Sequence, residues 1–173
     1  YVDHTHSNAF LSLINLKHSR EICKKLFINK LGIVPYVMPG FDLAKLCYKI
    51  YQTNKDVEGL ILLNHGIFTF GDSAKQSYDR MIKYVNIVEN FIATGKKNIK
   101  SKNIIKVRGL EKISLIIRKT YSRIDKNRWI IKIHNSKNDI KFSLFQDLEK
   151  LFSKGPVTPD HVIRIKSKPL IIK

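Results

Sequence analysis

The fold of this chain is decided by the stretch Glu58-Gly-Leu-Ile-Leu-Leu-Asn-His-Gly-Ile-Phe-Thr-Phe-Gly71. It is an almost continuous apolar run that is broken once, by Asn64-His65-Gly66. Apolar runs of about four to eight residues are typical of strands that are buried on both faces. We therefore expect a buried strand, a bulge or kink at Gly66, and a second strand that ends at Gly71.

Helical and strand patterns flank this run on both sides. Apolar residues recur at helical spacing after residues that favour helix N-caps, and they alternate where strands are expected. In this half we expect helices over residues 7–16, 19–31, 42–51 and 73–93, and short strands over 2–6 and 33–37. The strand over 33–37 contains Pro35, which predicts a position near an edge or a bulge.

Three histidines in this half could bind a metal ion. Val2, His4 and His6 would share one face of a strand, which aims both imidazoles to the same side. A His-x-His pair alone also fits two unrelated surface histidines, and His65 alone also fits a hydrogen-bonded core residue. Taken together, the three fit a catalytic site with three nitrogen ligands and one open position.

The second half predicts a smaller group of elements. A Lys-rich linker is expected over residues 96–106, and it could instead form an anion-binding patch. Beyond it we expect a helix over 110–124, strands over 129–134 and 140–143, and a helix over 146–152. The tail over 155–166 is expected to begin as a loop and to end as a strand.

The composition indicates one globular domain with an unusual charge. The chain has 173 residues, 43% of them hydrophobic, which is enough for one domain with a sizeable core. The formal net charge is +18, but the lysines are scattered among Ile and Asn, without a basic stripe or a nucleic-acid-binding motif. This pattern argues against a nucleic-acid-binding domain, an alternative that a salt-dependent binding assay would test.

Signals for secretion or membrane insertion are not evident in the sequence. The N-terminus has no charged-then-apolar segment, and the longest apolar runs are too short to cross a bilayer. Cys23 and Cys47 lie in apolar helical patterns and are expected to be buried, reduced thiols. We therefore expect a cytoplasmic protein with no membrane partner. Because the chain begins with Tyr1 rather than Met, we interpret it as a fragment of a longer protein.

Several motifs resemble the class II aldolase/adducin family over residues 1–94. Asp3-His-Thr-His-Ser-Asn8 resembles its His-x-His motif, Val34-Pro-Tyr-Val-Met-Pro-Gly-Phe-Asp-Leu-Ala44 its next strand, loop and helix, and Leu62-Leu-Asn-His-Gly-Ile-Phe-Thr-Phe-Gly71 its third metal-histidine segment. The resemblance implies a three-layer α/β/α fold with a central, mainly antiparallel or mixed sheet. It also implies that His4, His6 and His65 bind one divalent metal ion, with zinc expected.

The tail Gly155-Pro-Val-Thr-Pro-Asp-His-Val-Ile-Arg164 resembles a narrower branch, the bifunctional rhamnulose-1-phosphate aldolase/alcohol dehydrogenases. The resemblance implies a metal-dependent lyase of rhamnose catabolism that splits rhamnulose 1-phosphate into dihydroxyacetone phosphate and lactaldehyde. It implies a homo-oligomer whose acid/base Glu and phosphate-binding loop would lie upstream of Tyr1. An epimerase or dehydratase acting on a sugar phosphate and a non-catalytic adducin-like protein remain alternatives.

The same resemblance suggests how the chain is divided. Residues 1–95 would form the metal-binding half of the domain, 96–106 the linker, and 107–173 a C-terminal extension of the same domain. His161 and Arg164 either belong to a packed surface loop or approach the substrate side of the metal. In the second case Arg164 could meet an anionic group of the substrate.

Overall fold

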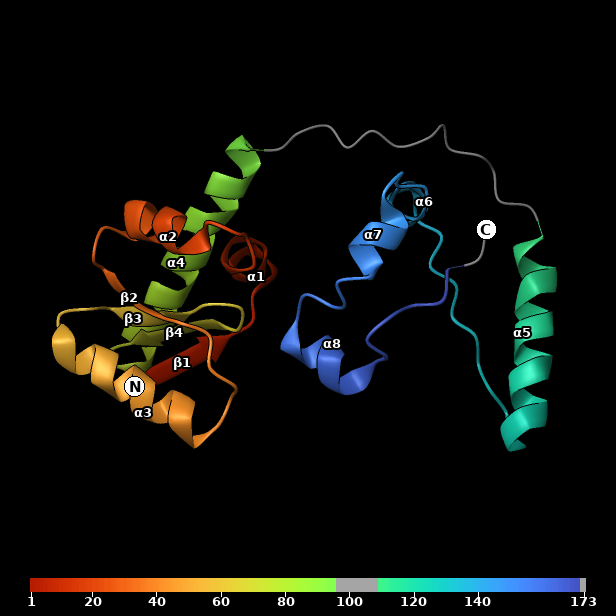
Figure 1. Cartoon of the computed structure of the whole chain (residues 1–173), viewed down its shortest axis with the longest axis horizontal. Helices are drawn as coiled ribbons and strands as arrows, with labels where there is room; N and C mark the ends of the chain where they lie inside the picture. The colour runs from red at the N-terminus through yellow and green to blue at the C-terminus, as the bar shows by residue number, and fades with distance from the viewer. Residues whose placement is uncertain (96–108, 172–173) are drawn as a thin grey trace. The chain divides into compact units, whose positions relative to one another are not determined.

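The computed structural model describes residues 1–95 and 109–171. The chain folds as two units, the first comprising Tyr1–Lys97 with Lys154–Lys173 and the second Asn98–Ser153. Figure 1 labels their elements along the chain. The Lys-rich linker that was predicted over 96–106 lies outside the described residues.

The first unit is built on a mixed sheet. Its four strands in the described residues are β1 (Val2–Thr5), β2 (Leu31–Val34), β3 (Gly59–Leu62) and β4 (Gly66–Phe70), in the order β1-β4-β3-β2. The β2–β3 pair is parallel, and the other two pairs are antiparallel. The prediction of a mixed sheet is confirmed, and β2 is an edge strand that ends just before Pro35.

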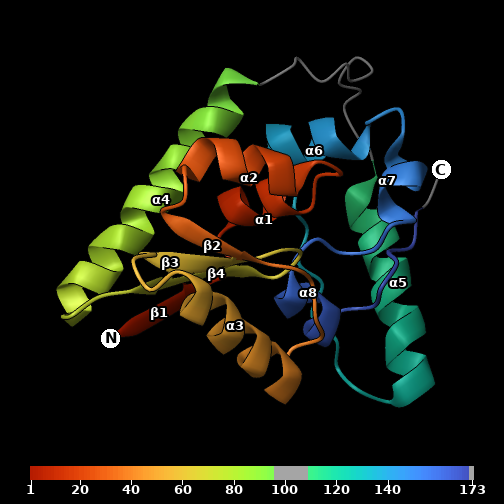
Figure 2. The ribbon, with the colours of Figure 1, turned by 60° about the vertical axis from the view of Figure 1, so that its left-hand side comes forward.

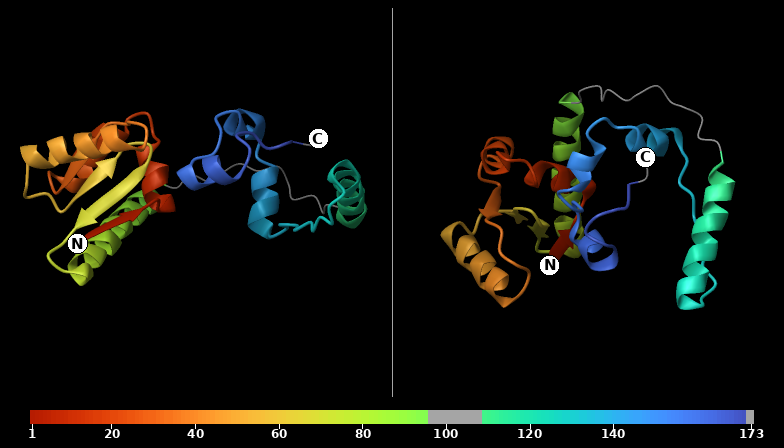
Figure 3. Two further views of the ribbon diagram at one scale, coloured as in Figure 1. Left: turned by 90° about the horizontal axis from the view of Figure 1, so that it is seen from below. Right: turned by 45° about the vertical axis from the view of Figure 1, so that its right-hand side comes forward.

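Helices cover both faces of this sheet, as Figures 1 and 2 show. Helices α1 (Asn8–Ile14), α2 (Ser19–Phe27) and α4 (Ala74–Thr94) lie on one face, and α3 (Phe41–Thr53) lies on the other. Two further views in Figure 3 show α3 and α4 on opposite sides of the strands. The predicted three-layer α/β/α architecture is therefore confirmed.

Alternation along the strands divides the apolar side chains between two cores. Ile61 and Ile67 pack with α1, α2 and α4. Leu60, Leu62 and Phe68 point to the opposite face and pack with α3. Because His4 pairs with Phe68 across β1 and β4, its side chain lies on the α3 face of the sheet.

Two local predictions for this unit need correction. Helix α2 ends at Phe27, where Ile28 adopts a left-handed conformation with φ 41°, and not at Gly32. Gly32 lies within β2, where an added Cβ would meet the Leu60 side chain at 2.6 Å. The glycine therefore allows close packing between strands instead of stopping a helix.

The expected bulge or kink at Gly66 is a hairpin instead. Leu62 pairs with Gly66, so the chain reverses direction through Leu63, Asn64 and His65. Asn64 takes a left-handed conformation with φ 59°, which asparagine tolerates better than most residues. Its side-chain amide also donates to the Asn15 side chain at 3.0 Å. These contacts turn the most apolar run of the chain back on itself at His65.

The second unit contains α5 (Leu110–Asp125), α6 (Lys137–Ser143) and α7 (Leu148–Phe152) in its described part. The helices predicted over 110–124 and 146–152 are confirmed by α5 and α7. Both predicted strands are wrong. Residues 129–134 have no regular secondary structure, and 140–143 lie in α6, whose N-terminus is held by a capping box of Ser136 and Asp139.

The tail returns to the first unit and forms a short helix. Helix α8 (Pro159–Arg164) replaces the strand that was expected at the end of the tail. Thr158 caps it by accepting a hydrogen bond from the His161 main-chain N–H, and Pro159 occupies the first turn. Both features are typical helix-start signals, so the sequence 158–161 explains why a helix forms.

Candidate metal centre

The sheet topology brings His4, His6 and His65 together at one end of β1. His4 lies on β1, His6 follows the end of that strand, and His65 lies in the β3–β4 hairpin. Because β1 pairs antiparallel with β4, its C-terminal end lies beside the start of β4, close to the hairpin. One ring nitrogen from each histidine lies within 4.8 Å of the others. The three residues predicted from the sequence thus form a cluster.

Gly66 provides the space in which the rings of His4 and His6 lie. A Cβ at this position would be 2.5 Å from the Thr5 carbonyl oxygen, 2.9 Å from His6 Cδ2 and 3.1 Å from His4 Cε1. A real Cβ essentially never makes contacts this short at the first two of these atoms. The close approach of the rings therefore requires glycine at the start of β4.

Hydrogen bonds determine which nitrogen of His4 and His6 faces the cluster. His4 Nδ1 lies 3.0 Å from the Ile67 carbonyl oxygen, which can only accept, so Nδ1 donates its hydrogen. His6 Nδ1 lies 3.0 Å from Asp160 Oδ2 in the same way. The His6 bond holds the pKa of the Asp160 carboxyl below its usual value, so this group is an ionised acceptor at neutral pH.

These bonds leave two nitrogen lone pairs facing each other. In the neutral rings, Nε2 of His4 and Nε2 of His6 are both without hydrogen, yet they lie 3.0 Å apart. Two lone pairs at this distance repel unless a cation, either a proton or a metal ion, lies between them. In a tetrahedral zinc site with bonds of about 2.0–2.1 Å, neighbouring nitrogens are about 3.3 Å apart, so the pair fits a shared ion closely.

Burial disfavours a proton as the cation between the two rings. Burial lowers the pKa of His4; the hydrogen bond to Ile67 opposes this lowering, and the nearby His6 ring adds to it. Burial also lowers the pKa of His65, with His4 and His6 as further contributors. Neutral imidazoles are the form that binds metal ions. The electrostatics of the cluster therefore fit a divalent ion.

His65 has a buried ring nitrogen that lacks a partner. Its Nδ1 makes no hydrogen bond with any residue that the structure describes. Leaving a buried polar atom unsatisfied costs about 1–3 kcal/mol, so such atoms call for an explanation. An ion bound through this nitrogen would supply the missing partner. The donor set as a whole, three imidazoles, is one that zinc accepts.

His161 and Arg164 are not part of this cluster. The His161 ring bonds to the Thr158 hydroxyl in its own helix turn, and both His161 and Arg164 are exposed. Arg164 lies near enough to Asp160 to lower the pKa of that carboxyl. Substrate binding by His161 and Arg164 stays a prediction. Asp160 itself was missed, because nothing in the sequence around it indicated a contact with a histidine 154 residues away.

Glu58 belongs to a separate polar group at the start of β3. Its carboxylate accepts from the Tyr84 hydroxyl at 2.6 Å and the Lys83 ammonium at 3.1 Å, and Arg80 lies 3.8 Å away. Burial alone would raise the pKa of Glu58, but the bonds from Tyr84 and Lys83 lower it overall. These contacts tie α4 to the sheet and indicate a structural role for this carboxylate.

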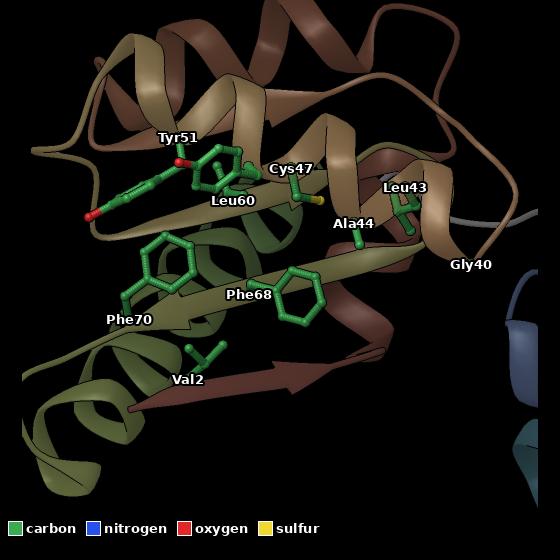
Figure 4. Close-up of a pocket in the computed structure, with 10 residues that line it drawn as sticks. Val2, Gly40, Leu43, Ala44, Cys47, Tyr51, Leu60, Phe68 and Phe70 are labelled. Carbon is green, nitrogen blue, oxygen red and sulfur yellow. The ribbon is translucent and has the colours of Figure 1, made fainter.

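An apolar cavity of about 430 Å³ lies between α3 and the sheet, and Figure 4 shows side chains that line it. Phe68 lines the cavity and also contacts His4, with ring centroids 4.4 Å apart. Burial raises the pKa of the Cys47 thiol in its wall, which keeps that thiol protonated at neutral pH. The cavity therefore suits apolar groups.

Comparisons with known proteins identify the family to which the chain belongs. Residues 1–92 match the family described as Class II Aldolase and Adducin N-terminal domain, and residues 109–173 match Aldolase class II, second domain. In the described residues, no helix has the length and apolarity needed to cross a membrane.

Individual relatives are similar over different parts of the chain. The uncharacterized oxidoreductase YuxG of Bacillus subtilis (strain 168) is 25% identical over 181 residues, which cover 99% of this chain but 26% of the relative. The chain thus spans about a quarter of that protein's length.

Two solved structures are also similar. The N-terminal class II aldolase domain of a conserved Thermoplasma acidophilum protein is 38% identical over 53% of this chain and 41% of that chain, with a TM-score of 0.47. An aldolase II superfamily protein from Pseudomonas syringae is 18% identical over 87% of this chain and 56% of that chain, with a TM-score of 0.44.

Proposed function

The chain belongs to the class II aldolase and adducin family, and from this premise we propose that His4, His6 and His65 hold one divalent metal ion, with zinc expected. The observation that carries the proposal is the 3.0 Å distance between Nε2 of His4 and Nε2 of His6. Both rings donate their Nδ1 hydrogens to other acceptors, so neither Nε2 carries a hydrogen in the neutral rings. Three imidazole ligands leave the open position that a catalytic zinc site needs.

We propose that the reaction is the retro-aldol cleavage of a ketose 1-phosphate. The substrate we favour is rhamnulose 1-phosphate, which would give dihydroxyacetone phosphate and lactaldehyde. A bound divalent ion supplies Lewis-acid stabilisation of the negative charge that develops when the carbon–carbon bond breaks. The family membership supports the reaction class, and the sequence of the tail supports the choice of sugar phosphate.

The residues of this chain would orient the ligands and shape the surroundings. The Ile67 carbonyl accepts a hydrogen bond from His4, and the Phe68 ring packs beside His4. Arg164 is proposed to meet the phosphate, with His161 beside the substrate. The acid/base group is proposed to be the glutamate that the family resemblance places upstream of Tyr1. A homo-oligomer in the cytoplasm is the expected assembly.

Metal content is the direct test of the site. Wild-type protein, His65→Ala and His4→Ala would be purified identically and assayed for zinc, with His18→Ala as the control, since His18 is exposed and precedes α2. We expect about one zinc per wild-type and control chain and a large loss in both cluster variants. Full zinc retention in both cluster variants would refute the proposed site.

The reaction requires a separate assay on the full-length protein. Release of dihydroxyacetone phosphate from rhamnulose 1-phosphate would be followed with a coupled reductase, and other ketose and pentulose phosphates would be compared. Loss of the signal in His65→Ala would link the cleavage to the cluster. A zinc-loaded protein that isomerises a pentulose phosphate without releasing dihydroxyacetone phosphate would contradict the aldolase assignment and favour an epimerase.

A further inference from the structure

The acceptors that orient His4 and His6 are of different kinds. His4 donates to a main-chain carbonyl of the neighbouring strand, which no side-chain substitution removes. His6 donates to the Asp160 carboxylate, which lies 154 residues away along the chain on α8. His6 is thus the ligand whose orientation depends on a side chain from the tail.

We propose that Asp160 is a positioning residue that fixes the ring of His6 so that Nε2 faces the metal cluster. The proposal rests on the metal site proposed above. An imidazole that ligates a metal needs its other ring nitrogen to donate to an acceptor, because this selects the tautomer and stops the ring from turning. The Asp160 carboxylate oxygen at 3.0 Å from His6 Nδ1 meets that requirement.

The exposure of Asp160 indicates that its contact with His6 orients the imidazole ring more than it stabilises the fold. The Asp160 side chain is 61% exposed, whereas that of His6 is 22% exposed. Even a charged pair at the surface contributes little to folding, and a hydrogen bond from a neutral imidazole to this exposed carboxylate should contribute no more. Removal of an acceptor that orients a ligand typically weakens metal binding about 10- to 100-fold. The two roles therefore predict clearly different results for one substitution.

Asp160 is held in place by the start of its own helix. Thr158 caps α8, Pro159 occupies the first turn, and Asp160 follows directly. Asp160 lies in the segment that matches the second aldolase domain, whereas His6 lies in the segment that matches the first. The tail thereby contributes to the metal centre of the N-terminal family segment. By linkage, metal binding should in turn favour the α8 position that presents Asp160.

The test compares zinc binding in three variants of the whole chain. Asp160→Ala removes the acceptor, Asp160→Asn keeps an oxygen that can accept from Nδ1, and Asp42→Ala is the matched control. Asp42 is another exposed aspartate in the first turn of a helix, and it pairs with Lys45. In competition with a chromogenic chelator, we expect Asp160→Ala to weaken zinc binding about 10- to 100-fold. Asp160→Asn should lose less, and Asp42→Ala should match the wild type.

A second readout separates positioning from a general loss of structure. In protein with ¹⁵N-labelled histidine, nuclear magnetic resonance should show His6 with its hydrogen on Nδ1 in the wild type. Asp160→Ala should give a mixture of tautomers for His6, with that of His4 unchanged. Wild-type zinc affinity and an unchanged His6 tautomer in Asp160→Ala would overturn the proposal. Equal weakening of zinc binding in Asp42→Ala would also overturn it.

Failure of this inference can be told apart from failure of the metal site. If the wild type binds no zinc, both ideas fail. If the wild type binds zinc and His65→Ala loses it while Asp160→Ala keeps it, only the positioning role is wrong. Thermal unfolding of each metal-free variant would show whether it is folded before its zinc affinity is compared.

Discussion

Replacing Gly66 with alanine should disrupt the histidine cluster without adding any polar group to it. The new Cβ would lie 2.5 Å from the Thr5 carbonyl oxygen, whereas ordinary contact begins near 3.4 Å, so this oxygen or the start of β4 must move by about 0.9 Å. The oxygen belongs to backbone that pairs with Ile67, so it cannot yield as a flexible side chain would. His6 and His4 must also withdraw, since their rings lie 2.9 and 3.1 Å from the same Cβ.

The displacement is large compared with what a metal site tolerates. Ligand distances in such sites hold to within about 0.2 Å. To reach ordinary contact the His6 and His4 rings would have to move by about 0.5 and 0.3 Å, which exceeds this tolerance and should weaken zinc binding. Overpacking of this kind also costs about 1–3 kcal/mol of stability. For a domain of this size, each kcal/mol lowers the unfolding midpoint by about 2–4 °C. We therefore expect a moderate fall in Tm together with a disproportionate loss of zinc affinity.

The assay would combine chelator competition for zinc with thermal unfolding of the metal-free protein. Gly95→Ala is the matched control, because an added Cβ there would meet its nearest neighbours at 3.8 and 3.9 Å. The control should keep wild-type zinc affinity. If Gly66→Ala bound zinc as tightly as the wild type and unfolded at the same temperature, the argument that Gly66 makes room for the two rings would be wrong.

Two pH-dependent predictions follow from the charged and titratable groups. Burial lowers the pKa of His4 and His65 below the usual 6.5, so their neutral, ligating forms persist below that pH. Zinc retention, measured against pH, should therefore be complete at pH 6.5 and fall only in more acidic buffer. Loss of half the zinc above pH 6.5 would contradict this prediction. The pKa of Glu58 is lower in the folded protein than its usual value of 4.5 in the unfolded chain. The ionised carboxylate therefore stabilises the fold at pH values above 4.5, and this contribution is lost as the pH falls through the lower, folded-state pKa. The Tm of Glu58→Gln should therefore fall less than that of the wild type between pH 5 and pH 3, and parallel Tm curves would exclude the linkage.

The cluster of histidines could be anticipated because it depends on short-range patterns. His4 lies on β1 and His6 directly follows the end of that strand, so the two-residue period of extended backbone places both on one side. His65 interrupts an apolar run next to a glycine, and this position made it a candidate third ligand. The hairpin at this point was not predicted, because an apolar run that turns through Asn64 has the same pattern as a strand with a bulge or kink.

Features that depend on distant partners could not be anticipated. Asp160 lies 154 residues from His6, and no local pattern in the sequence relates the two residues. The predictions of strands over 129–134 and 140–143 were wrong for a related reason. A strand needs a neighbour to pair with, whereas α6 needs only its own capping box at Ser136 and Asp139. Over residues 140–143, local hydrogen bonds therefore prevailed over the β-propensity of the apolar residues.

The register of β1 against β4 is the feature on which the site depends most. A slip of one residue would move His4 from the α3 face to the opposite face and bring Asp3 or Thr5 to its place. The observed register pairs His4 with Phe68 and Thr5 with Ile67, and it also places the Ile67 carbonyl where His4 Nδ1 can donate to it. The same pairing thus sets which face His4 occupies and which of its nitrogens is free. A substitution that weakens β1–β4 pairing should therefore reduce zinc affinity even where it touches no histidine.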